Sequence, residues 1–128
     1  MASENVEYLN GIYERWSQGD FRTPIAEEFV LDMGPDLPDA GRYEGPEGVA
    51  TYTRGFLEPW ERITISAEKM IDREDSVLVR VHQVGTGMIS GVETEQRYFH
   101  LWTFKGSVPI RMQTTLDESE AMSRLGVG

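Results

Sequence analysis

The spacing of hydrophobic residues changes along the chain from a helical period to a strand period. From Ser3 to about Gln18, apolar side chains recur every three or four residues, which predicts an amphipathic helix. Ser3 suits the N-cap of this helix, and Gly19-Asp20 supplies its end. A second, short helix is predicted from Thr23-Pro24 to about Glu28, because proline favours the first helical position.

The next stretch carries a short strand, a loop and a third helix. Residues 29–31 favour a strand, whereas residues 34–45 hold three glycines and two prolines and are predicted to form a loop. The third helix is predicted to begin at Gly45-Pro46-Glu47. Pro59 limits it to about Glu58.

Beyond residue 60 the apolar residues alternate with a period of two, as strands with one buried face require. The segments joined by short turns are Ile63–Ala67, Val77–Val81, Tyr98–Phe104 and Val108–Met112. Asp117 is a good cap for a last, short helix. Helices followed by a run of antiparallel strands predict a single α+β domain over residues 1–128, with helices on one face of the sheet.

Composition narrows the function classes. The 128 residues include 12 Lys and Arg against 22 Asp and Glu, a net charge of −10, and no cysteine. The absence of cysteine excludes a disulfide framework and Cys-ligated zinc. The acidic excess argues against nucleic acid and anionic membrane surfaces as partners. Neither a signal peptide nor an apolar run of about 20 residues is evident, so a cytoplasmic protein is expected.

Several local strings, taken in order, carry a resemblance over nearly the whole chain. They are Trp16-Ser17-Gln18-Gly19-Asp20, Val30-Leu31-Asp32-Met33, Tyr43–Ala50, Gly87–Glu93 and Tyr98–Phe104. The chain resembles the SnoaL-like and ketosteroid-isomerase-like branch of the nuclear-transport-factor-2-like superfamily. This resemblance implies three N-terminal helices packed on a strongly curved antiparallel sheet, a cystatin-like α+β barrel with a cone-shaped pocket. It also implies a homodimer formed through the convex side of the sheet.

The strand pattern independently favours a covered outer face. Alternation sends His100 and Trp102 to one face of their strand, and Phe99 and Leu101 to the other. One apolar face must meet the core, and a partner subunit is the economical cover for the second.

Asp32 is the first candidate for catalysis. It stands between apolar neighbours in a short strand, where burial of a carboxylate is costly. The resemblance implies that an acid near this position faces the pocket and moves a proton on a carbon next to a carbonyl, with its pKa raised by desolvation. The alternative is a strand-end aspartate that caps the turn at Gly34 or pairs with a surface arginine.

His100 is the second candidate. The resemblance places it near the position where steroid isomerases carry an acid that donates to an oxyanion, so it can serve as a donor or as a general acid/base. The alternative is a buried histidine bonded to a tyrosine or to backbone. His82 lies on the opposite strand face from the valines and is expected to be structural or interfacial. The two histidines with Asp32 do not have metal-ligand spacing, so no metal site is expected.

Aromatic side chains are expected to fill the core and, in part, to line the pocket. The predicted pocket residues are Tyr13, Trp16, Tyr52, Phe56, Trp60, Tyr98 and Trp102. The oxyanion tyrosine of steroid isomerases would fall near Ile12, which argues against that activity. Arg97 with Asp32 resembles part of the relay of epoxide hydrolases, but the last strand contains no acid to complete it.

Two functional hypotheses remain open. In the first, the protein binds a medium-sized apolar molecule bearing carbonyl or hydroxyl groups, and can act as a cofactor-free cyclase, isomerase or lyase. Asp32 would then be the base, His100 the acid or oxyanion donor, and Tyr13 or Tyr52 an orienting hydroxyl. In the second, the domain is a non-catalytic ligand-binding or dimerisation module. An open cavity would favour an enzyme or binder.

Overall fold

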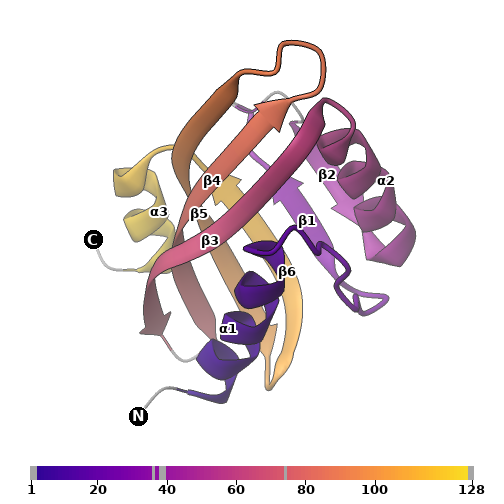
Figure 1. Cartoon of the computed structure of the whole chain (residues 1–128). Helices are drawn as coiled ribbons and strands as arrows, with labels where there is room; N and C mark the ends of the chain where they lie inside the picture. The colour runs from indigo at the N-terminus through magenta and orange to yellow at the C-terminus, as the bar shows by residue number, and fades with distance from the viewer. Residues whose placement is uncertain (1–2, 36, 38–39, 74, 127–128) are drawn as a thin grey trace.

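The chain folds into one curved sheet with helices packed around it, as Figure 1 shows. The computed structural model describes residues 3–35, 37, 40–73 and 75–126. The elements are α1 (Glu4–Trp16), β1 (Val30–Met33), β2 (Gly41–Glu44), α2 (Gly45–Leu57), β3 (Trp60–Arg73), β4 (Ser76–Gly87), β5 (Glu93–Lys105), β6 (Val108–Thr115) and α3 (Glu118–Leu125). This is an α+β arrangement, as the sequence predicts.

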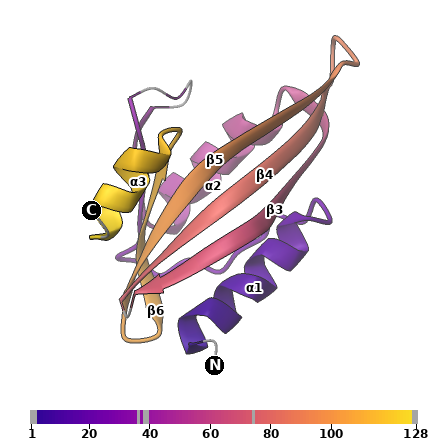
Figure 2. The same cartoon turned by 90° about the vertical axis from the view of Figure 1, so that its left-hand side faces the viewer.

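The sheet has six strands in the order β2-β1-β6-β5-β4-β3. All neighbours pair antiparallel except β1 and β6, which run parallel, so the prediction of a purely antiparallel sheet is wrong at this one pair. Register shifts interrupt the β3–β4 and β5–β6 ladders. Such bulges bend a strand, and they accompany the curvature of the long strands in Figure 2.

The helix starts follow the predicted capping. In α1 the Ser3 hydroxyl accepts a hydrogen bond from the Val6 amide, and in α3 the Asp117 carboxylate accepts from two amides of the first turn. The N-terminus of α2 carries proline in its first turn, as predicted. A cap oxygen satisfies amides that have no partner inside the helix, which fixes the starts of α1 and α3 locally, whereas α2 begins at its proline without a side-chain cap.

The second predicted helix is wrong, because residues 23–28 are not helical. Thr23 instead accepts a hydrogen bond from the indole Nε1 of Trp16, and a turn from Ala26 to Phe29 leads into β1. Six residues make too few helical bonds to compete with such tertiary contacts. The predicted loop over 34–45 contains β2, which begins at Gly41; its residues 36, 38 and 39 lie outside the described residues.

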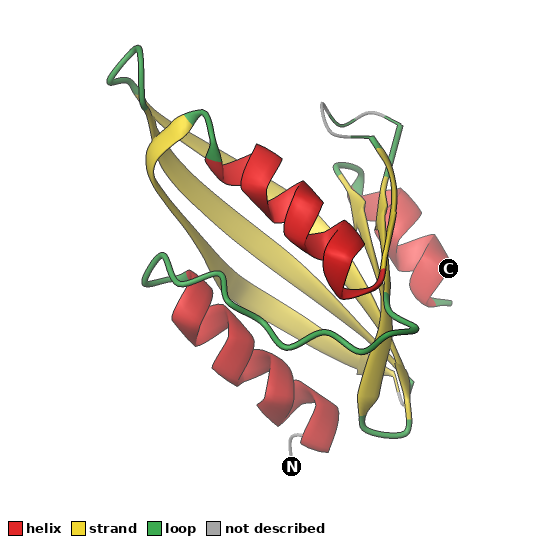
Figure 3. Ribbon diagram, turned by 90° about the vertical axis from the view of Figure 1, so that its right-hand side faces the viewer, coloured by secondary structure: helices red, strands yellow, loops and turns green. Residues whose placement is uncertain are grey.

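The three helices of the described chain divide between the two faces of the sheet. Figure 3 shows α1 and α2 across one face, while Figure 2 shows α1 and α3 on opposite sides of β3–β5. On the outer face, Ala121 and Leu125 of α3 pack over Leu78, Phe99 and Leu101. The chain's own helix therefore covers this part of the second apolar face, where the sequence suggests a partner subunit. The homodimer stays a prediction.

Position 85 in β4 has no space for a side chain, so the fold requires glycine there. A Cβ there would lie 2.6 Å from Cε3 and 2.7 Å from Cζ3 of the Trp60 ring. We predict that Gly85→Ala lowers the free energy of unfolding by about 1–3 kcal/mol through overpacking, measured by urea denaturation. Gly11→Ala is the control: its Cβ meets nothing within 4 Å, and alanine favours helix. Equal stability of the two variants would contradict this packing.

Candidate ligand-binding site

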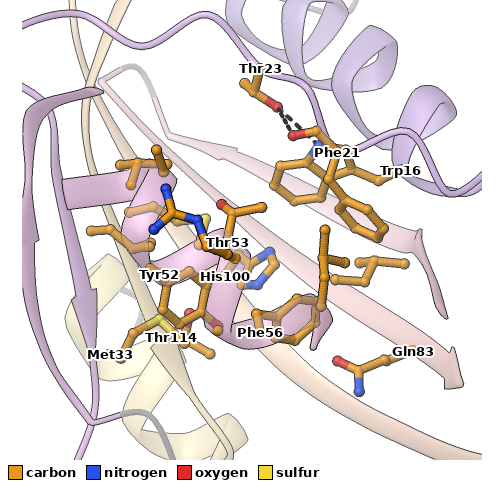
Figure 4. Close-up of a pocket in the computed structure, with 18 of the residues that line it drawn as sticks. Trp16, Phe21, Thr23, Met33, Tyr52, Thr53, Phe56, Gln83, His100 and Thr114 are labelled. Atoms are coloured by element: carbon orange, nitrogen blue, oxygen red, sulfur yellow. Dashed lines mark hydrogen bonds between the residues drawn. The ribbon is translucent and has the colours of Figure 1, made fainter. Parts of the chain in front are cut away.

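A cavity of about 940 Å³ lies between the inner face of the sheet, α2 and the segment that follows α1. Its walls are mostly apolar, and Figure 4 shows His100 among the rings of Trp16, Tyr52 and Phe56. Six of the seven aromatic residues that the sequence places in a pocket line this cavity. They are Trp16, Tyr52, Phe56, Trp60, Tyr98 and Trp102.

Strand alternation explains how the sheet supplies the floor. In β5 the side chains of Tyr98, His100 and Trp102 point inward, and the opposed inward positions of β6 are Met112 and Thr114. All five are buried. The floor therefore contains one imidazole and the hydroxyls of Tyr98 and Thr114 among aromatic rings and a thioether.

His100 is held by a chain of buried hydrogen bonds through Tyr13, which lies behind the floor, to Trp102. The Tyr13 hydroxyl lies 2.6 Å from His100 Nδ1, and Trp102 Nε1 donates to the Tyr13 oxygen at 2.8 Å. An indole N–H can only donate, so the phenol's own proton must go to Nδ1 if it is to be paired. Nδ1 is then the acceptor nitrogen, and the ring proton of His100 resides on Nε2.

Burial keeps this group of side chains uncharged. Desolvation lowers the pKa of His100 to about 3, and burial raises the pKa of Tyr13 well above its usual value. His100 lines the cavity, and its Nε2 has no hydrogen-bond partner among the described residues. The cavity floor thus presents a neutral N–H donor with its bonding capacity unused.

Tyr13 does not line the cavity, contrary to the prediction. It lies on the face of α1 that packs into the core, with 3% of its surface exposed, and its hydroxyl is used by His100 and Trp102. Its contribution to the site is to orient the imidazole. The second hydroxyl that the sequence suggested, that of Tyr52, belongs to a residue that does line the cavity.

The prediction that Asp32 faces the pocket is wrong. Its neighbours Leu31 and Met33 line the cavity, and a strand sends the residue between them to the opposite face. There the Asp32 carboxylate accepts a hydrogen bond from the Arg111 guanidinium at 2.7 Å, and its side chain is 36% exposed. This arrangement is the surface ion pair that stood as the alternative.

His82 and Arg97 lie on the outer face of the sheet. His82 Nε2 is 2.7 Å from a Glu95 carboxylate oxygen, and Arg97 donates to Glu68. The structure therefore does not bring His82 together with His100, nor Arg97 with the cavity. In the described part of the chain, no three His, Asp or Glu side chains gather in a way that could hold a metal ion.

Sequence reasoning missed several polar side chains of the cavity, among them Gln83, Thr114 and Arg54. Tyr98 donates its hydroxyl proton to Gln83 Oε1 at 2.6 Å, Thr114 carries a buried hydroxyl unpaired among the described residues, and Arg54 stands on α2. Alternation could have found the first two, because Gln83 continues the inward row of Val81 and Thr114 that of Met112.

Comparison with known proteins identifies the family. Residues 9–107 match the model of the SnoaL-like domain, and the chain belongs to this SnoaL-like family. No curated protein matches the chain. None of the helices in the described ranges has the length and apolar character that a membrane span requires.

Solved structures share the nuclear-transport-factor-2-like fold. One such protein from Burkholderia pseudomallei, of unknown function, is 15% identical with a TM-score of 0.78 over 95% of this chain and 97% of that chain. TerC, co-crystallised with polyporic acid, is 15% identical with a TM-score of 0.76 over 97% and 99%. A candidate SnoaL-like polyketide cyclase from Jannaschia sp. CCS1 is 17% identical with a TM-score of 0.73 over 98% and 93%. At these identities the likeness establishes the fold.

The low pKa of His100 makes stability depend on pH. Unfolded histidine binds a proton below about pH 6.5, whereas folded His100 binds one only near pH 3. The stability that this group contributes is therefore complete above the unfolded pKa and is lost as the pH falls, by up to about 1.4 kcal/mol per pH unit.

We predict that urea unfolding from pH 7 to pH 5 shows a steeper loss of stability for the wild type than for His100→Gln. Glutamine does not titrate, so the stability difference between the two proteins narrows as the pH falls. Parallel curves over this range would show that His100 does not stay neutral in the folded protein.

Proposed function

We propose that this protein binds an apolar small molecule through a carbonyl or hydroxyl oxygen, which accepts a hydrogen bond from His100 Nε2. The single observation that carries the proposal is the imidazole donor without a protein partner on the floor of a mostly apolar cavity. A cavity of about 940 Å³ is of the size that small-molecule sites have. TerC, which shares the fold, has been crystallised with a small molecule, polyporic acid.

The energetics favour an acceptor on the ligand. The imidazole N–H of His100 has no partner among the described residues, so an acceptor on the ligand can form one hydrogen bond there, which contributes about 0.5–1.5 kcal/mol net. An ether or hydrocarbon of the same shape would gain only the burial of apolar surface. The site therefore selects for shape through its rings and for an oxygen acceptor through His100.

The same donor defines what catalysis the site supports. A hydrogen bond to a carbonyl oxygen stabilises the negative charge that develops when a proton leaves the neighbouring carbon, which is the first step of isomerisation or aldol cyclisation. Among the described residues that line the cavity, Asp20 is the sole carboxylate. The hydrogen bond from the Arg22 side chain lowers the pKa of Asp20 to about 2, which makes it a weak base.

Ligand binding is thus the function that the geometry supports best, and cyclase or isomerase chemistry is the second candidate. The second is favoured by the oxyanion-type donor and by the candidate polyketide cyclase among proteins of this fold. With Asp32 outside the cavity, the chain's own contribution to such a reaction is polarisation of the carbonyl by His100.

All three tryptophans line the cavity, so intrinsic fluorescence reports its occupancy. We predict that the affinity ratio of 1-tetralone to tetralin falls about fivefold in His100→Phe, because one hydrogen bond contributes on the order of 1 kcal/mol. His82→Phe, on the outer face, is the control and keeps the wild-type ratio. An unchanged ratio in His100→Phe would contradict the proposed bond.

Deuterium exchange at the carbon beside the carbonyl of 1-tetralone separates the two candidate functions. A polarising enzyme accelerates this exchange relative to buffer, and His100→Phe abolishes the acceleration. A protein that only binds 1-tetralone leaves the exchange rate at its value in buffer, although the tryptophan fluorescence still changes on binding.

A further inference from the structure

The rim of the cavity carries charge, in contrast to its apolar walls. Among the described lining residues the charged side chains are Asp20, Arg22 and Arg54. Asp20 and Arg22 neutralise one another through two parallel hydrogen bonds, each 2.9 Å long. One arginine therefore remains to set the charge at the opening.

Arg54 has no ion-pair partner in the part of the chain that the structure describes. It lies in the last turn of α2 and is exposed, and Glu58, one turn further on, does not pair with it. The chain as a whole is acidic, because its acidic residues exceed the basic ones by ten. An uncompensated guanidinium at the opening makes this region locally positive within an acidic chain.

We propose that the ligand is an amphipathic anion, with its oxygen acceptor at His100 and a carboxylate or a similar anionic group at Arg54. This inference rests on the proposed function, since it assigns the second end of the same ligand. His100 is 3% exposed whereas Arg54 is exposed, so the two groups mark the buried and the solvent end of one cavity. A guanidinium binds such oxyanions through two hydrogen bonds.

Arg54 also has a purely structural explanation, which the test must separate. A cation in the last turn of a helix interacts favourably with the negative end of the helix dipole. Loss of that interaction would lower stability and would affect neutral and anionic ligands alike. Discrimination between an anion and its neutral counterpart is therefore the decisive readout.

The experiment compares two fluorescent probes that share a ring system. 8-Anilinonaphthalene-1-sulfonate carries a sulfonate, and N-phenyl-1-naphthylamine is the same molecule without it. In Arg54→Gln we expect the sulfonate probe to bind about three- to tenfold more weakly, and the neutral probe to bind as in the wild type. Arg73→Gln, an exposed arginine at the far end of β3, makes the same change in net charge and leaves both affinities unchanged.

The other outcomes would contradict either the role of Arg54 or the binding in the cavity, and the experiment distinguishes them. Equal effects of Arg54→Gln on both probes, or an equal effect of Arg73→Gln on the sulfonate probe, would show that Arg54 does not recognise an anion. Failure of both probes to compete with 1-tetralone in the wild-type protein would instead overturn the proposed binding in this cavity. A melting temperature recorded for each variant verifies that it is folded.

Discussion

The hydrogen-bonded chain from Trp102 through Tyr13 to His100 is the interaction on which the site depends. It joins α1 to the central strand β5, and all three side chains are buried. Removal of Tyr13 would leave both Trp102 Nε1 and His100 Nδ1 without their partner, at a cost of about 1–3 kcal/mol per buried group. The same bonds that fasten the helix to the sheet therefore fix the tautomer of the imidazole, so that packing and chemistry are set together.

The rest of the cavity follows from this constraint. Because burial keeps His100 neutral and Tyr13 protonated, the floor offers a donor without a charge, and an apolar ligand can approach it without desolvating an ion. Charge is confined to the rim, where Asp20 and Arg22 cancel and Arg54 does not. The polarity of the pocket therefore changes with depth: the floor is polar but neutral, the walls are aromatic, and the opening carries the positive charge of Arg54.

The sequence predicted what local patterns determine, and missed what distant segments decide. Capping at Ser3 and Asp117 and the period-two pattern predicted α1, α3 and the strands after residue 60 correctly. The helix predicted at residues 23–28 does not form, because Thr23 is bound by Trp16, and β2 lies within the predicted loop. Parallel pairing of β1 with β6 joins segments some eighty residues apart and leaves no local signal. The position of Asp32 was predictable in part: alternation with Leu31 and Met33 already places it on the other face, and the resemblance overrode that pattern.

The most direct test of the account is the tautomer of His100 at pH 7, read from long-range correlations between the ring protons and ring nitrogens in ¹⁵N NMR. The account predicts a neutral imidazole with its proton on Nε2, and Nδ1 with the shift of a hydrogen-bonded acceptor that changes in Tyr13→Phe. A proton on Nδ1, or a charged imidazolium, would contradict it, because neither form leaves a neutral donor facing the cavity.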